Sequence, residues 1–385
     1  MRGIRRLPLL IASTLQFAIR LGMGLLLQFR MRELGAPLFL VSLVSSIRGG
    51  TSSLMSPVWG SISDKKRKRK IFLILSSIGT AVSISLYLIS DSPLSIMLVA
   101  ALVAVFSSGF NPIAMALSTE YSEKKNSQAR ELSFLNSSNS LGMLIGRLLV
   151  GTLLIYFSVK ESMSFLVVLT WIAVLPVFFV KEVGNSEEAR KKKKSFKDIK
   201  SALKKNGLWS IYLSAFIRQF GTSGIMSLAA IYLTEKIGIK RSSVGFISAI
   251  NPIVQTPSHI FFGKIVDKFG SKFLAAFGVA LSSVVALIFL FGKSVVDISI
   301  AYATLGFAFG AFINGTAMFI TKSTERWERA SALGFLNTSR QLGFMLGPVV
   351  AGVLASVSYN ILFLTMALIM MVGAIIVAVF SREPR

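Results

Sequence analysis

The sequence predicts an all-α integral membrane protein with twelve transmembrane helices arranged as two pseudo-symmetric six-helix bundles. Three observations predict this fold: an apolar composition, twelve apolar runs, and an internal repeat that matches the first half of the chain to the second. Of the 385 residues, 53% are hydrophobic and only 15% are charged. A water-soluble protein of this size needs more charge to cover its surface, whereas spans of about 20 apolar residues cross a bilayer.

The chain is strongly basic, with 42 Lys and Arg against 17 Asp and Glu and a formal net charge of +25. In a water-soluble protein this excess would indicate nucleic-acid binding. In a membrane protein it indicates basic cytoplasmic loops that contact anionic lipid headgroups, so we expect a lipid partner and no nucleic acid. The sequence has no cysteine and one histidine. Thiol chemistry is therefore excluded, and we expect no enzyme, no metal and no cofactor.

Apolar runs between charged loops indicate the spans. The first run continues past Phe29, which is too long for the apolar core of a cleavable signal peptide, so we expect it to be retained. The twelve predicted spans are 7–29, 37–62, 71–90, 94–118, 132–157, 163–180, 208–233, 242–262, 272–291, 296–320, 331–357 and 361–380.

A long polar segment separates the sixth span from the seventh. It predicts an N-terminal bundle of residues 1–181, a basic cytoplasmic linker of residues 182–206 and a C-terminal bundle of residues 207–385. Phe196, Ile199 and Leu203 fall on one face of a helix that could lie on the membrane surface. A solvated basic linker explains the same residues equally well.

The distribution of Lys and Arg among the loops predicts the orientation. The N-terminus, the even-numbered loops and the C-terminal tail hold most of them, and all six residues from Lys65 to Lys70 are basic. Basic loops stay in the cytoplasm. We therefore expect a multi-pass protein of the cell membrane with both termini inside.

The two halves of the sequence repeat each other. "FLNSSNSLGMLIGRLLVG" (134–151) matches "FLNTSRQLGFMLGPVVAG" (335–352), and "WGSISDKK" (59–66) matches "FGKIVDKF" (262–269). These pairs are separated by about 200 residues. Six spans, an even number, separate the copies, so both halves run in the same direction. Such halves are related by an axis along the membrane normal and enclose a site at their interface.

The loop between the second and third spans carries a recognisable signature. "GSISDKKRKRK" and "GKIVDKFGSK" keep the Gly-x-x-x-Asp-basic pattern, with Arg67 in place of the usual glycine in the first copy and Ser271 in place of a basic residue in the second. Together with the 6+6 spans, this pattern resembles the major facilitator superfamily over essentially the whole chain. The resemblance implies that the cluster latches the two halves on the cytoplasmic side; enforcement of topology is the alternative. The cluster comprises Gly60, Asp64, Lys65, Lys68, Arg69, Gly263, Asp267, Lys268 and Gly270.

The fifth and eleventh spans carry glycines at intervals of four and five residues. Small residues at such intervals let helices approach closely in lipid. We therefore expect these glycines to pack helices: Gly142, Gly146, Gly151, Gly343, Gly347 and Gly352.

Five arginines lie inside predicted spans: Arg20, Arg48, Arg147, Arg218 and Arg340. Each costs about 2.5–3.5 kcal/mol near a helix centre. The acidic residues lie in loops or at span ends, so they cannot neutralise all five. Such arginines should face a wet cavity, and a positive cavity favours an anion.

The family resemblance implies that the first, fourth, seventh and tenth spans line a central cavity. Arg20 and Arg218 then resemble the arginine pair of the organic-phosphate antiporter branch, and guanidinium groups suit phosphate and carboxylate. A structural role, with bonds to backbone carbonyls or nearby Gln and Asn, remains the alternative. The candidate substrate-binding residues are Arg20, Arg218, Asn111, Asn314, Gln16, Gln219 and Arg48.

These features predict a secondary transporter of a small organic or phosphate-bearing anion that works by alternating access, with antiport favoured because no carboxylate lies mid-span. The alternative is a proton-coupled exporter of hydrophobic drugs or other small molecules, in which His259 could carry the proton. We expect a monomer.

Overall fold

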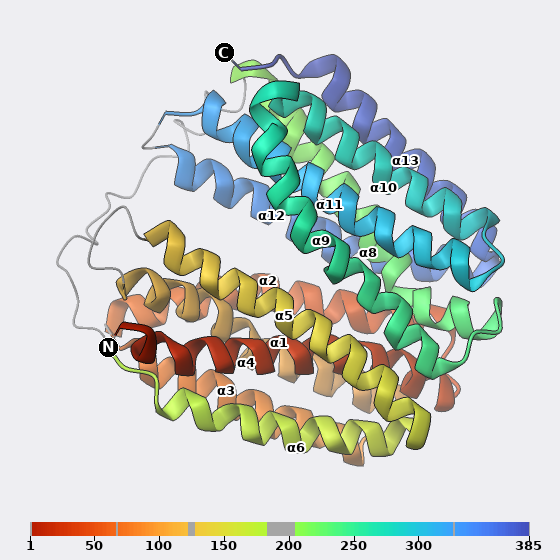
Figure 1. The fold of residues 1–385 in the computed structure, drawn as a ribbon. Coiled ribbons are helices and arrows are strands. Elements are labelled where there is room, and N and C mark those ends of the chain that lie inside the picture. The colour runs from red at the N-terminus through yellow and green to blue at the C-terminus, as the bar shows by residue number, and fades with distance from the viewer. Residues whose placement is uncertain (1, 67, 122–127, 183–204, 326–327, 385) are drawn as a thin grey trace. The chain divides into compact units, whose positions relative to one another are not determined.

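The computed structural model describes residues 2–66, 68–121, 128–182, 205–325 and 328–384. Within these ranges every regular element is a helix, which confirms the predicted fold class (Figure 1). The helix expected around Phe196 and the turn at Arg67 lie outside the described residues.

Contacts divide the chain into two compact units, Met1–Arg190 with Lys240–Phe246, and Lys191–Ile239 with Ile247–Arg385. Each unit contains six long helices in chain order. The first contains α1 (Arg2–Glu33), α2 (Leu38–Lys66), α3 (Arg69–Ser85), the 3₁₀ helix η1 (Leu86–Ile89), α4 (Pro93–Glu120), α5 (Gln128–Tyr156) and α6 (Val159–Phe178). The second contains η4 (Lys205–Gly207), α8 (Leu208–Glu235), most of α9 (Arg241–Phe269), α10 (Ser271–Phe291), α11 (Val295–Ser323), α12 (Arg329–Val357) and α13 (Tyr359–Phe380).

The two units repeat one packing pattern. In the first, α1 packs against α5 and α6, and α3 packs against α4 and α6. In the second, α8 packs against α12 and α13, and α10 packs against α11 and α13. The sequence repeat therefore corresponds to a repeated three-dimensional arrangement of helices.

Glycines allow the closest of these contacts. Gly146 of α5 lies against the backbone of Ala18 in α1, and Gly347 of α12 lies against the backbone of Phe220 in α8. Gly142 and Gly343 contact α1 and α8 in the same way. At each of these positions a Cβ would collide with backbone atoms of the neighbouring helix, so the small residue sets the distance between the helices.

Ten helical segments of the described chain are long and apolar enough to cross a membrane. Helices α8 and α9 are not among them, because polar residues such as Arg218, Gln255 and His259 interrupt their apolar runs. Helix α8 is nevertheless buried along nearly its whole length. A helix surrounded by other helices does not need a lipid-compatible surface, and this explains its lower hydropathy.

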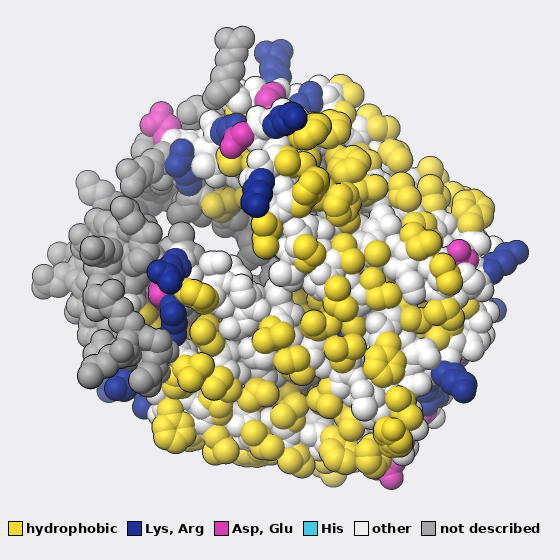
Figure 2. Space-filling model, in the orientation of Figure 1, with side chains coloured by type: hydrophobic (Ala, Val, Ile, Leu, Met, Phe, Trp, Pro, Cys, Tyr) yellow, Lys and Arg dark blue, Asp and Glu magenta, His cyan; other side chains and the backbone are white. Residues whose placement is uncertain are grey.

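Large hydrophobic side chains cover the outside of the helices, as lipid contact requires. Leu54, Ile89 and Phe291 are 75%, 76% and 72% exposed. Figure 2 shows hydrophobic side chains over most of the visible face, with Lys and Arg gathered towards its margins. This distribution is the reverse of a water-soluble surface and suits a bilayer.

Two carboxylates that the sequence analysis overlooked cap helices in equivalent places. Glu182, after α6, accepts hydrogen bonds from the backbone N–H groups of Arg69 (2.6 Å) and Lys70 (2.7 Å) at the start of α3. Glu383, after α13, accepts from the N–H groups of Ser271 and Lys272, both at 2.7 Å, at the start of α10. A carboxylate at a helix N-terminus satisfies otherwise unpaired donors and interacts favourably with the helix dipole.

Candidate functional site

A cavity that is partly open to solvent lies among α1, α2, α3, η1 and α4 of the first unit. Its wall combines apolar side chains with a few polar groups, which is the usual composition of a small-molecule site. The lining residues are Gln16, Phe17, Ile19, Arg20, Met23, Arg48, Thr80, Ile84, Tyr87, Val103, Ser107, Phe110 and Asn111. Four of the candidate residues from the sequence, Gln16, Arg20, Arg48 and Asn111, are among them.

Two arginines give this cavity its charge. Arg20 of α1 is exposed and Arg48 of α2 is half-buried. Arg48 donates from Nη2 to the backbone carbonyl of Arg20 at 3.3 Å, a long bond to a neutral acceptor. A Cβ at Gly24 would lie 3.0 Å from Arg48 Nη1, so the glycine leaves room for the guanidinium to lie across α1.

Within the part of the chain that the structure describes, two buried polar atoms of the cavity wall have no hydrogen-bond partner. They are Nε2 of Gln16, whose residue is 8% exposed, and the hydroxyl of Tyr87, whose residue is 2% exposed. The described side-chain contact of Asn111 is a weak one, from Nδ2 to the sulfur of Met115 at 3.8 Å. An unpaired buried polar group costs about 1–3 kcal/mol, so these groups are available to a bound solute or to water.

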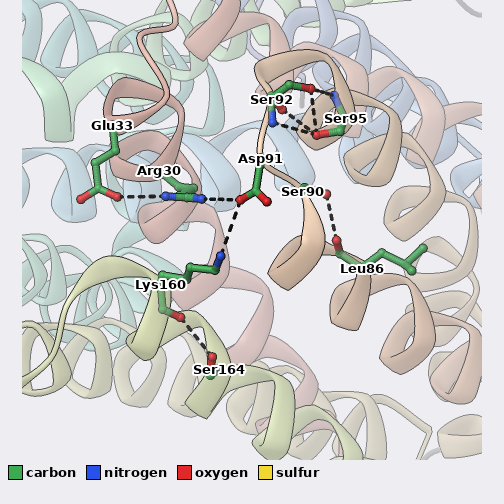
Figure 3. A network of polar contacts seen from close by, with 9 residues as sticks. All are labelled: Arg30, Glu33, Leu86, Ser90, Asp91, Ser92, Ser95, Lys160 and Ser164. Atoms are coloured by element: carbon green, nitrogen blue, oxygen red, sulfur yellow. Dashed lines mark hydrogen bonds and ion pairs between the residues drawn. The ribbon is translucent and has the colours of Figure 1, made fainter.

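None of the described residues that line the cavity is a carboxylate. The described acids of the first unit lie at or near helix ends, where several of them pair with other basic residues. Arg6 contacts Glu131 at 3.1 Å. At the other end of α1, Asp91 accepts from Arg30 (3.1 Å) and Lys160 (3.5 Å), in the network of Figure 3. The positive charge of Arg20 and Arg48 is therefore not balanced by any acid in the cavity wall.

The remaining candidates lie in the second unit. Arg218 of α8 is buried and donates from Nε to the hydroxyl of Ser282 at 2.9 Å. Asn314 of α11 donates from Nδ2 to the carbonyls of His259 (3.2 Å) and Gly310 (2.9 Å). Gln219 is half-buried on α8, and its Cβ faces the position of Gly343 on α12.

The signature residues form ion pairs within their own units. Arg69 bonds to Asp64, to Glu120 through Nε at 3.1 Å and to the Ser63 hydroxyl at 2.7 Å, so it ties the ends of α2, α3 and α4 together. In the second unit Asp267 pairs with Lys322 of α11 at 3.1 Å.

The other signature residues lie at these helix ends without packing tightly. Lys65, Lys68 and Lys268 are exposed, and a Cβ at Gly60 would meet nothing within 4 Å. A Cβ at Gly263 would lie 3.4 Å from Asn314. Gly270 adopts a φ of 89°, where a glycine is favoured, in the turn before α10.

Tyr121, just after α4, is a further anchor at this end of the first unit. Its hydroxyl donates to the Lys181 carbonyl at 3.0 Å, and burial raises the pKa of this tyrosine above its usual range. The hydroxyl therefore stays protonated at physiological pH and can keep donating.

Sequence reasoning missed the wall that α3 and η1 contribute. Thr80, Ile84 and Tyr87 resemble ordinary apolar helix residues, and no Gly or Pro marks the change from α3 to the 3₁₀ turn at Leu86–Ile89. The sequence also gave no sign that Arg340 lies near Arg218. The capping acids could have been found, because Glu182 and Glu383 occupy matching positions after the sixth and twelfth helices.

A polytopic all-helical protein with two copies of one six-helix unit and an apolar, positively charged cavity among its helices has the architecture of a membrane solute carrier. The chain matches the Major Facilitator Superfamily over residues 9–217 and 211–385, so both halves are covered. The chain belongs to this superfamily, and it is a multi-pass membrane transporter.

Named relatives and solved structures agree with this assignment. A multidrug resistance protein, MdtG of Klebsiella pneumoniae (strain 342), is 25% identical over 349 residues, which cover 89% of this chain and 84% of the relative. The structure of the nucleoside transporter NupG has a TM-score of 0.83 at 16% identity and covers 97% of this chain and 98% of NupG. A bacterial homologue of the human lysosomal transporter Spinster has a TM-score of 0.80 at 16% identity, and the match covers 98% of this chain and 96% of that homologue.

Proposed function

We propose that this chain is a secondary transporter of amphiphilic organic anions, and that the cavity of the first unit binds their anionic group. Arg20 and Arg48 supply the positive charge, and Gln16, Tyr87 and Asn111 supply hydrogen-bonding groups. The apolar part of the solute contacts the rest of the wall, including Phe17 and Phe110. Alternating access of the two bundles moves the solute across the membrane.

The observation that carries this proposal is the pair of arginines in a cavity without a carboxylate. An anion 4 Å from one guanidinium gains about 4 kcal/mol at an effective dielectric constant of about 20, and a cation there is repelled by the same amount. A guanidinium also offers paired donors that fit phosphate, phosphonate or carboxylate oxygens. The wall therefore favours anionic solutes over cationic drugs.

The second candidate is a proton-coupled exporter of hydrophobic compounds. The name of the relatives, multidrug resistance protein, favours this function, and so do the apolar wall residues Met23, Ile84 and Val103. The two candidates share the same cavity and differ in the charge of the solute and in the need for a pH gradient.

Transport into proteoliposomes tests the proposal. The purified protein is screened with organic phosphates, phosphonates, carboxylates, sugars and cationic dyes, with and without a pH gradient. We expect an anion to be transported, and transport to fall in Arg20→Gln and Arg48→Gln. Lys160→Gln is the matched control, because Lys160 lies outside the cavity in the network of Figure 3. Dye movement driven by a pH gradient, unaffected by both arginine variants, would refute the anion model and support the exporter.

Two further expectations belong to the same transport cycle. We propose that both termini are cytoplasmic and that the signature clusters of Asp64 and Asp267 latch the bundles on that side. Their pairing with Arg69 and Lys322 within each unit supports a role in holding helix ends in register. Labelling of single cysteines, introduced at Lys293 and at Lys68 in this cysteine-free chain, tests the orientation, because both positions are exposed and the predicted topology places them on opposite sides of the membrane. A reagent that does not cross the membrane should reach only the first position in intact cells.

A further inference from the structure

We propose that the second unit contains its own anion site, formed by Arg218 and Arg340 around the ring of Phe309. The proposed transport function requires only the cavity of the first unit, so this second site goes beyond it. Its ligand is a small oxyanion, such as phosphate, sulfate or the phosphonate or carboxylate head of an organic molecule.

Arg218 is the most strongly buried part of this site. The residue is 2% exposed, and its Cζ lies 4.8 Å from the ring centre of Phe312 and 5.3 Å from that of Phe309. Its Nε donates to Ser282, whose hydroxyl donates onward to the carbonyl of Gly278 at 2.8 Å. The buried Nη2 atom has no hydrogen-bond partner among the described residues. A guanidinium held this firmly, with an unused donor, is arranged to bind an acceptor that the protein itself does not supply.

Arg340 of α12 completes the site. Its Cζ lies 5.5 Å from the ring centre of Phe309, so the guanidinium groups of Arg340 and Arg218 both lie against the same ring. The buried Nε of Arg340 likewise finds no hydrogen-bond acceptor in the described ranges. Three helices therefore contribute: α8 and α12 bring the charges, and α11 brings the aromatic ring that both guanidinium groups contact.

The aromatic rings compensate only part of the charge. Cation–π contacts stabilise a guanidinium, but they leave its N–H donors unsatisfied and do not remove the mutual repulsion of two like charges. The acids of the second unit that the structure describes lie at helix ends or beyond them. They are Glu235, Asp267, Asp297, Glu325, Glu328 and Glu383. An exogenous anion would supply the countercharge that these acids are too far along the helices to give.

A third polar group borders the site. The ring of His259 meets the Phe309 ring edge to face, with 5.6 Å between centres, and its Nε2 lies 3.4 Å from Nε2 of Gln255. In this contact the Gln255 amide nitrogen donates and the His259 ring nitrogen accepts, so Gln255 is the donor on this side of Phe309 and can supply its second N–H to an oxyanion. The arginines of the first unit differ, because the Arg20 side chain is exposed and Arg48 bonds only to a backbone carbonyl among its described contacts.

Binding of inorganic phosphate to the purified full-length protein in detergent tests this inference. Radiolabelled phosphate is titrated into the wild type, the double variant Arg218→Gln/Arg340→Gln and the double variant Arg20→Gln/Arg48→Gln. We expect two phosphates per wild-type chain and one in each double variant. Arg340→Gln alone, at a half-buried position, repeats the measurement if the first double variant does not fold. Thermal unfolding and gel filtration verify the fold of each protein.

The outcomes separate this inference from the proposed function. Phosphate binding that is lost with Arg218 and Arg340 but kept without Arg20 and Arg48 supports the second site, even if the first cavity binds nothing. Binding that depends only on Arg20 and Arg48 overturns the second site and leaves the proposed function intact. Unchanged stoichiometry in Arg218→Gln/Arg340→Gln, or no phosphate binding at all, also overturns it.

A competition experiment identifies the source of the oxyanion. Phenylphosphonate is added to the Arg20→Gln/Arg48→Gln protein loaded with phosphate. Displacement supports a site that accepts the head group of an organic anion. Displacement by sulfate but not by phenylphosphonate supports a site for a free inorganic anion, and displacement by neither overturns the assignment of an oxyanion site.

Discussion

Replacing Arg48 with glutamine separates substrate recognition from folding more cleanly than any other change in the cavity. Its described contact with the protein is the 3.3 Å bond from Nη2 to the Arg20 carbonyl. Because this bond is long and lies at an exposed site, it contributes about 1 kcal/mol or less although its donor is charged, and glutamine can keep part of it. We therefore expect the free energy of unfolding of Arg48→Gln to stay within about 1 kcal/mol of the wild type.

The effect on transport should be much larger. Arg48 is available to make a charge-assisted hydrogen bond to an anionic solute, and such a bond contributes about 1.5–3 kcal/mol. Because each 1.4 kcal/mol changes affinity tenfold, the half-saturating concentration of a transported anion should rise by about 10- to 100-fold. Arg48→Lys keeps the charge but loses the paired donors. Its half-saturating concentration should therefore lie between those of the wild type and Arg48→Gln.

The assay is concentration-dependent uptake of the best anion from the solute panel into proteoliposomes, with reconstitution verified by protein recovery. Lys160→Gln provides the control, since it removes a positive charge at the end of the same unit without touching the cavity. An Arg48→Gln protein that is folded and transports the anion with a half-saturating concentration within twofold of the wild type would refute the reasoning.

Three further predictions follow from individual contacts. Gly24→Ala places a Cβ 3.0 Å from Arg48 Nη1, so the guanidinium must shift and anion affinity should fall several-fold at unchanged stability, as measured by uptake and thermal unfolding. Gly146→Ala should lower the free energy of unfolding by about 1–3 kcal/mol, because the new Cβ overpacks against α1. Gly60→Ala places its Cβ in open space and should leave stability unchanged or slightly raised. Equal effects of the two substitutions on unfolding would contradict the packing role of Gly146. Glu383→Gln should cost about 0.5–2 kcal/mol of stability through loss of the carboxylate cap on α10, which chemical denaturation would measure against wild type.

The sequence was sufficient to predict the fold because the signals for it are long-range and redundant. Apolar runs, basic loops and the repeat each predict the same twelve helices. Their ends were less predictable: α1 begins at Arg2 and reaches Glu33, and α2 reaches Lys66, beyond the apolar runs. A helix continues past the hydrocarbon as long as its backbone bonds are satisfied, and hydropathy does not report that point.

The cavity was only partly predictable. Charge in an apolar run is conspicuous, so Arg20 and Arg48 stood out in the sequence. Tyr87 did not, because its role depends on a 3₁₀ turn that places a buried hydroxyl in the cavity wall. The association of Arg340 with Phe309 was equally hidden, since it depends on which side chains of α11 and α12 face each other, and the repeat carries no information on that.

Two arginines near equivalent places of the repeat illustrate why duplicated bundles can serve different tasks. Gly146 contacts Ala18 and Gly347 contacts Phe220, so Arg20 and Arg218 lie about one helical turn apart in the repeat. The first side chain is exposed and the second is 2% exposed. The cause is local. Ser282 and the rings of Phe309 and Phe312 enclose Arg218, whereas a cavity shared with Arg48 surrounds Arg20. The repeat preserves the backbone packing, because glycines such as Gly146 and Gly347 fix the distance between helices. Side chains that face the interior of each bundle are not held by that packing, so the two halves can diverge in the anions they recognise while they keep one architecture.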